Sequence, residues 1–329
     1  MKIVDYDRHI FMNPSLICNF DCIYCRQHDN HIKSIKEFNI ENFVQRLNRY
    51  DKTFLVTISG GEPFLIPNFI EFISELTKKH YVRIDTNLSL TDACRRFANT
   101  IAPSRVVEIV FSTHVLEREK RKINLLELVS LVKEFQKKGF AMVGNYVVYP
   151  PLIGRMERDI DFFNSRGIRV LPNLLQGKFE GKMYPLDNGC LSYSKDELES
   201  VIRLNPYAKI PLHNPRNELC QAGCTAFFIN DQYEVSPCFT MRNIKLGDFS
   251  EEWGPYPKVI RCPKEYCTDQ YNKTLCCSLA EFHLGLNYTQ LKAILENGAS
   301  SPLESRILLG GGWKKILSNK LKKIFRYPL

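Results

Sequence analysis

The chain has 329 residues, of which 44% are hydrophobic, enough for the core of one large domain and a smaller one. No apolar run reaches the roughly 18 residues of a transmembrane helix, and the first residues lack the apolar stretch of a signal peptide. The net charge is +9, but residues 305–329 hold seven basic and no acidic residues, which leaves +2 for the remainder. We therefore expect no nucleic-acid binding by the body of the protein.

Strand-like and helix-like segments alternate through the first half of the chain. Strands alternating with helices of about 10–15 residues indicate parallel βαβ units. The pattern alone does not separate a barrel from an open doubly wound sheet, but in both folds ligands bind at the carboxyl ends of the strands. We predict strands at 9–13, 54–59, 81–86, 106–112, 141–148 and 168–172, and helices at 39–49, 67–79, 90–99, 123–138 and 155–166.

Three cysteines follow the first predicted strand with the spacing C-x3-C-x2-C: Cys18, Cys22 and Cys25. Three thiolates can hold three irons of a [4Fe–4S] cluster and leave the fourth iron open for another ligand. A zinc site is the alternative, because His28 would complete a Cys3His set. Twelve cysteines in short spacings, without an export signal, favour metal ligation in a reducing cytoplasm over a disulfide framework.

A second motif, Ser59-Gly60-Gly61-Glu62-Pro63, follows the second predicted strand, about 35 residues after Cys25. Glycines at a strand end let the backbone approach a ligand closely, although this stretch alone is also a good turn. The two motifs in this order resemble those of the radical S-adenosylmethionine (SAM) enzymes, in which an aromatic residue such as Tyr24 precedes the last cysteine. The resemblance implies an α/β fold with a partial (β/α)6 TIM-like barrel.

The resemblance also implies a cofactor arrangement. The cysteines would hold a [4Fe–4S] cluster whose open iron chelates SAM, and Gly60 to Pro63 would bind the SAM amino group, with the Glu62 carboxylate suited to an ammonium. Polar residues at strand ends point into a barrel mouth, so we expect further SAM contacts there, although His114 could equally be an ordinary loop histidine. These expected SAM contacts are Asn87, Ser112 and His114. In the fifth predicted strand, Gly144 and Asn145 could allow close approach of the adenine. At the end of the sixth, Asn173, Gln176 and Lys178 would face substrate. No general base can be named.

A second cysteine group, Cys220, Cys224 and Cys238, spans a predicted hairpin whose turn brings its ends together. It resembles the auxiliary-cluster domain called SPASM or, in its shorter form, Twitch, although the usual turn glycine is missing. We expect one auxiliary [4Fe–4S] cluster, with a fourth ligand from a later group that could instead form a zinc knot or buried thiols. This group is Cys262, Cys267, Cys276 and Cys277. Cys94 is expected to be a core thiol and Cys190 a loop thiol.

We divide the chain into a radical SAM barrel, a bridge, an iron–sulfur domain and a basic tail, at 1–175, 176–218, 219–300 and 301–329. The resemblance implies reductive cleavage of SAM to a 5′-deoxyadenosyl radical, which abstracts a hydrogen from substrate, with electrons from a donor such as flavodoxin or ferredoxin. Because only 17 residues precede Cys18, we expect no N-terminal peptide-recognition domain. This favours a small polar or saccharide substrate over a peptide or protein side chain.

The basic tail has its apolar residues on one helical face, which is typical of a helix lying on an anionic membrane. We therefore expect peripheral membrane contact through residues 313–327, with a lipid-linked substrate as one consequence. A terminal helix packed on the barrel is the alternative. The alternative to an enzyme is a zinc-binding interaction module, with RNA contact through the tail as one form of it.

Overall fold

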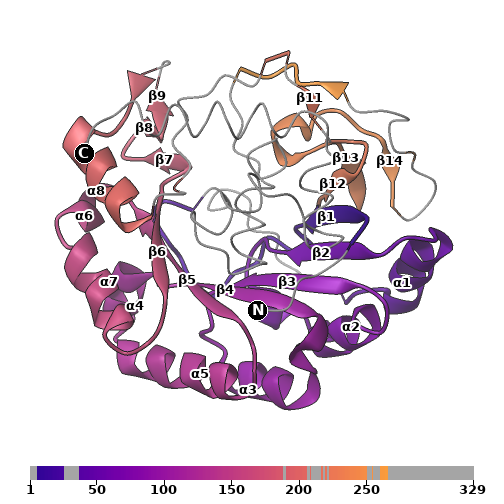
Figure 1. Cartoon of the computed structure of the whole chain (residues 1–329), viewed down its shortest axis with the longest axis horizontal. Helices are drawn as coiled ribbons and strands as arrows, with labels where there is room; N and C mark the ends of the chain where they lie inside the picture. The colour runs from indigo at the N-terminus through magenta and orange to yellow at the C-terminus, as the bar shows by residue number, and fades with distance from the viewer. Residues whose placement is uncertain are drawn as a thin grey trace, which may run out of the picture.

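The computed structural model describes residues 6–25, 37–187, 190–205, 208, 216–217, 219–220, 222–249, 254 and 260–265. Within these residues nine strands form one sheet in the order β14-β13-β12-β1-β2-β3-β4-β5-β6. The sheet curves, and the helices lie along its outer side (Figure 1). The strands of this sheet are β1 (Arg8–Met12), β2 (Phe54–Ile58), β3 (Tyr81–Thr86), β4 (Val106–Ser112), β5 (Met142–Val148), β6 (Val170–Leu174), β12 (Ala226–Ile229), β13 (Glu234–Ser236) and β14 (Gly247–Asp248).

The helices and the shorter strands complete the described chain. The helices are α1 (Ile40–Arg49), α2 (Phe69–Leu76), α3 (Thr91–Thr100), α4 (Val115–Lys120), α5 (Leu125–Lys137), α6 (Pro150–Ile153), α7 (Met156–Asn164) and α8 (Lys195–Leu204). Three two-stranded pairs stand apart from the main sheet. They are β7 (Gly177–Phe179) with β8 (Lys182–Tyr184), β9 (Leu186–Asp187) with β10 (Cys190–Leu191), and β11 (Leu219–Cys220) with β15 (Ile260–Arg261).

Strands β1 to β6 pair in parallel in sequence order, as the alternating pattern predicts. Their sheet stays open, because β6 and β14 stand at its two ends in the described residues. The structure therefore confirms the expected α/β fold, and the parallel strands with outer helices are those of a partial TIM-like barrel. All six predicted strands and all five predicted helices are present, with ends shifted by no more than a few residues.

The core lies between the sheet and the outer helices. In β3 the buried residues Val82, Ile84 and Thr86 alternate with half-buried ones, so one face of the strand meets the helices. Aromatic rings continue this packing across the helices, because Phe97 of α3 stacks at 6.3 Å on Phe69 of α2. This packing holds the strand ends, where the site residues lie, in fixed positions.

The C-terminal hairpin β12–β13 joins the barrel sheet, which the sequence analysis did not anticipate. Strand β12 pairs with β1 in parallel, from His9 opposite Ala226 to Met12 opposite Ile229. The rings of Phe11 and Phe228 stack across this pair with centroids 6.1 Å apart. The predicted barrel and the predicted auxiliary domain thus share one continuous sheet.

No helix in the described part of the chain is long and apolar enough to cross a membrane. Several predictions lie outside the described residues: those on His28, on Cys267, Cys276 and Cys277, and on the basic tail.

Candidate active site

The loop that carries the first three cysteines runs directly along the end of β2. The amide of Gly61 donates to the carbonyl of Ser15 (2.8 Å), and the amide of Glu62 donates to the carbonyl of Ile17 (2.8 Å). A Cβ atom on Gly61 would lie 1.8 Å from the Ile17 oxygen, and one on Gly60, where φ is +112°, would lie 2.4 Å from the Ser15 oxygen. Only glycine fits at either position. The two glycines make room for the backbone of the cysteine loop. From the sequence, we had expected a ligand to approach them closely.

Glu62 is directed into the protein, with 1% of its surface exposed. Its Oε1 accepts from the Thr86 hydroxyl (2.7 Å) and the Phe64 amide (3.1 Å), and its Oε2 accepts from the Asn87 amide (2.7 Å). Burial raises the pKa of Glu62 to about 7, although these hydrogen bonds lower it. Pro63 is also buried and begins the 3-10 turn Pro63–Leu65. The carboxylate that we expected to meet the SAM ammonium thus ties the end of β2 to the end of β3.

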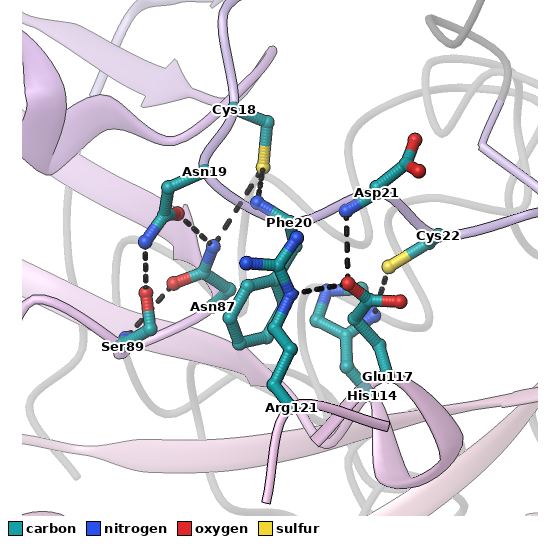
Figure 2. Close-up of polar contacts among 10 residues, drawn as sticks. All are labelled: Cys18, Asn19, Phe20, Asp21, Cys22, Asn87, Ser89, His114, Glu117 and Arg121. Atoms are coloured by element: carbon teal, nitrogen blue, oxygen red, sulfur yellow. Dashed lines mark hydrogen bonds and ion pairs between the residues drawn. The ribbon is translucent and has the colours of Figure 1, made fainter. Parts of the chain in front are cut away.

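Asn87, at the end of β3, links that strand to the cysteine loop (Figure 2). Its Nδ2 donates to Asn19 Oδ1 (2.9 Å) and lies 3.7 Å from the Cys18 sulfur. The amide of Phe20 also donates to that sulfur, at 3.4 Å. Asn19 in turn donates to the Ser89 hydroxyl (2.7 Å). Two N–H groups are therefore directed at Cys18, an arrangement that favours a thiolate ligand over a free thiol.

His114 lies against the cysteine loop from the other side, at the start of α4. Its Nδ1 is 2.7 Å from the Tyr24 hydroxyl. The same nitrogen is 3.3 Å from the Cys22 sulfur (Figure 2). The Tyr24 ring packs on the ring of Tyr149 at 4.6 Å. Burial, together with the nearby charge of Arg118, lowers the pKa of His114 to about 3, so the imidazole is neutral. The structure brings the predicted residues His114 and Tyr24 together, and both lie beside a cysteine.

Glu117 is a site residue that the sequence analysis missed. It is buried on α4, accepts from the amide of Asp21 at 3.1 Å and pairs with Arg121. Through Asp21 it fixes the middle of the cysteine loop. The i,i+4 spacing of Glu117 and Arg121 predicts an ion pair on a helix, but it does not indicate that the pair faces the loop.

Neutral polar side chains lie at the end of β4, in the middle of β5 and near the end of β6. Ser112 is half-buried and lies opposite Asn145 in the strand register. Asn145 Oδ1 accepts from Asn173 Nδ2 at 2.8 Å. These amide and hydroxyl groups extend the polar edge that begins at Asn87.

Gly144 sits on the opposite face of β5. A Cβ atom there would lie 2.5 Å from Cγ2 of Val170 and 2.9 Å from Cζ of Phe111, both core side chains. The core therefore fills the space beside Gly144, and the glycine serves the packing of β4 on β6. Our expectation that this glycine opens room for adenine does not agree with that placement.

The three thiols fit a [4Fe–4S] cluster with one open iron. Cys18 is half-buried, Cys22 buried and Cys25 exposed. Burial raises the pKa of Cys18 and Cys22, and the neighbouring Cys25 thiol raises both further. Such thiols need a cation to become thiolates, and bound iron supplies it. Among the described residues no three His, Cys, Asp or Glu side chains already converge on one metal position.

The later cysteines gather around a small core of their own. Cys220, Cys238 and Cys262 are buried in one apolar cluster with Met241. The pairing of β11 with β15 places Cys220 opposite Ile260, two residues before Cys262. Cys224 is half-buried. Cys94 is fully buried in the main core, as predicted, and Cys190 is exposed on β10.

Comparisons with known proteins agree with this arrangement. Residues 12–163 match the family model of the Radical SAM superfamily. An uncharacterized protein of Methanocaldococcus jannaschii, MJ0907, is 29% identical over 282 residues, which cover 80% of this chain and 94% of that protein.

Two solved structures share the fold. Streptococcus suis SuiB bound to S-adenosylmethionine gives a TM-score of 0.53 at 15% identity, covering 76% of this chain and 65% of SuiB. Native anSMEcpe with bound AdoMet gives a TM-score of 0.54 at 17% identity, covering 74% of this chain and 79% of that one. This chain therefore spans less than two thirds of the length of SuiB. The fold and the strand-end site define an α/β protein of the partial-barrel class. More particularly, residues 12–163 form a domain that matches the Radical SAM superfamily.

Proposed function

We propose that Cys18, Cys22 and Cys25 hold a [4Fe–4S] cluster whose open iron binds SAM, and that the enzyme abstracts a hydrogen from its substrate. When bound, cluster and SAM supply reductive cleavage to methionine and a 5′-deoxyadenosyl radical, using an electron from a donor such as flavodoxin or ferredoxin. The observation that carries the proposal is the bracing of the cysteine loop by the backbone of Gly61 and Glu62. This bracing holds the segment that leads into Cys18 against the carboxyl edge of the sheet, which supports the proposal.

The test is anaerobic reconstitution with iron and sulfide, followed by SAM and dithionite. The wild-type protein should release 5′-deoxyadenosine, and a variant with Cys18, Cys22 and Cys25 all replaced by alanine should not. Cys190→Ser is the matched control, because that thiol is exposed and remote from the loop in sequence. A colourless zinc protein, or cleavage that survives in the triple variant, would refute the proposal.

We also propose an auxiliary [4Fe–4S] cluster on Cys220, Cys224 and Cys238, completed by Cys262. The burial of Cys262 in one cluster with Cys220 and Cys238 favours it over the three later cysteines as the fourth ligand. Reconstituted wild type should then hold about eight irons, and Cys238→Ala about four, with SAM cleavage retained and substrate turnover lost. Cys262→Ser should behave like Cys238→Ala. An unchanged iron content in Cys262→Ser would assign the fourth ligand elsewhere.

The proposed substrate is a small polar molecule such as a saccharide. The neutral amides of Asn145 and Asn173 and the hydroxyl of Ser112 are suited to hydroxyl groups, which both donate and accept hydrogen bonds. A peptide substrate is the second candidate, because SuiB has been solved with a precursor peptide and anSMEcpe with the Cp18Cys peptide.

A fractionated extract separates the two candidates. If the substrate is a saccharide, the small-molecule fraction should stimulate 5′-deoxyadenosine release above the uncoupled rate. If it is a peptide, the peptide fraction should do so. Stimulation by the peptide fraction alone would overturn the saccharide proposal.

A further inference from the structure

Arg118 on α4 is a buried cation beside the cysteine loop, with 1% of its surface exposed. Its Nε donates to the carbonyl of Thr113 at 3.0 Å, and its Nη2 donates to the carbonyl of Asn87. Neutral carbonyls thus hold the guanidinium, and no carboxylate of the described residues forms an ion pair with it. Burial lowers the pKa of Arg118 to about 10, so it is charged at neutral pH.

The guanidinium of Arg118 lies over the ring of Phe20, a residue between Cys18 and Cys22 in the loop. The Arg118 guanidinium lies 5.3 Å from the centroid of the Phe20 ring, and the Phe20 amide donates to the Cys18 sulfur. One side chain therefore separates the charge from the cysteine loop. In such a dry environment a charge without an ion-pair partner acts over a longer range than it does at the surface.

Arg121 provides a natural comparison, because its guanidinium is also 5.3 Å from the centroid of the Phe20 ring. Unlike Arg118, it is 38% exposed and paired with Glu117 (Figure 2). Solvent and the partner carboxylate together cancel most of its field.

We propose that Arg118 sets the reduction potential of the cluster held by Cys18, Cys22 and Cys25. Reduction adds one electron and therefore one negative charge to the cluster, and a buried cation nearby stabilises the reduced form. Arg118 thereby raises the potential and eases electron entry from the donor. This role of Arg118 rests on the proposed function, because it requires a cluster on Cys18, Cys22 and Cys25.

The test is an EPR-monitored redox titration of the reconstituted holoenzyme without SAM, with dithionite as reductant. In Arg118→Gln, the ratio of reduced to oxidised cluster at a fixed potential should fall at least tenfold, a shift of about 59 mV for one electron. Arg118→Lys keeps the charge, so its reduction potential should differ from that of the wild type by less than about 59 mV. The double variant Arg95→Gln with Glu134→Gln removes an exposed ion pair away from the cysteine loop, so its potential should change by less than about 59 mV.

A second measurement covers the case in which Arg118→Gln assembles no cluster. Glu62 is the carboxylate whose charge acts most strongly on Arg118. At about pH 8.5, above the pKa of about 7 of the buried Glu62, Glu62→Gln removes this negative charge while keeping an acceptor, so the cluster potential should rise. An unchanged potential in an iron-loaded Arg118→Gln protein, or an unchanged or lower potential in Glu62→Gln, overturns the inference. Failure of the wild-type protein to form any iron–sulfur cluster would instead refute the proposed function.

Discussion

Gly61→Ala should displace the cysteine loop and disable the cluster site. The new Cβ atom would stand 1.8 Å from the Ile17 oxygen, while real Cβ atoms do not approach other atoms within 3.0 Å. The loop carbonyl must therefore move by more than about 1 Å, because that oxygen belongs to the backbone and not to a flexible side chain. The movement also breaks two backbone hydrogen bonds, from Gly61 to Ser15 and from Glu62 to Ile17. Each contributes about 0.5–1.5 kcal/mol, so we expect a loss of about 1–3 kcal/mol in the free energy of unfolding.

The assay measures iron content, the free energy of unfolding and 5′-deoxyadenosine release after anaerobic reconstitution. A misplacement of about 1 Å at a reacting centre can reduce a rate about 100-fold, so cleavage should fall by at least that factor. Gly154→Ala is the matched control, because a Cβ atom there meets nothing within 4 Å and its φ is −68°. If Gly61→Ala matched Gly154→Ala in iron and cleavage, the idea that these glycines admit the loop would be wrong.

Three further predictions concern other regions. Burial lowers the pKa of His80 from 6.5 to about 4. The stability that the neutral His80 contributes is therefore fully present above about pH 6.5 and is lost as the pH falls toward about 4. The share of this loss that comes from His80 is about 1 kcal/mol between about pH 7.5 and 5.5, so in urea titrations His80→Gln should lose about 1 kcal/mol less than the wild type over that range. Ser194→Ala removes the capping box of α8, in which Ser194 accepts from the Glu197 amide, and should lower the free energy of unfolding by about 1 kcal/mol. Deletion of residues 310–329 should abolish sedimentation with anionic vesicles at low salt; full-length protein that ignores such vesicles would contradict the membrane prediction.

The alternation of apolar and polar segments was sufficient to predict β1 to β6 and their helices, because each element buries one face locally. It was not sufficient for the pairing of β12 with β1, which joins residues more than 200 positions apart. The four residues of β12 are all buried, which is typical of a strand between two neighbours, but nothing in the local pattern names the neighbour. Placement of the auxiliary hairpin therefore required the structure.

In the site, too, local sequence was sufficient to predict some features, while others depend on distant parts of the chain. The spacing of Cys18, Cys22 and Cys25 was sufficient to propose them as ligands, since ligand chemistry depends on residue type. The burial of Arg118 could not be predicted, because its segment, Glu117 to Arg121, is highly charged and reads as a solvent-facing helix. The Phe20 side chain and the strand ends bury it, and both come from distant parts of the chain.

The placement of Glu62 changes the result expected for its removal. If the carboxylate only bound SAM, Glu62→Ala would weaken SAM binding and leave the cluster intact. In the structure, the alanine would leave three buried donors without an acceptor, on Thr86, Phe64 and Asn87. Unsatisfied donors cost about 1–3 kcal/mol each, although water entering the space would recover part of that.

We therefore expect Glu62→Ala to lose both stability and iron, because Asn87 also donates to Cys18. Glu62→Gln keeps the acceptor Oε1 and should retain most of the iron. Iron content by colorimetry and the free energy of unfolding by anaerobic urea titration distinguish the two roles. A stable Glu62→Ala protein with its full complement of iron, but with weakened SAM binding, would return Glu62 to the ligand-binding role that the sequence suggested.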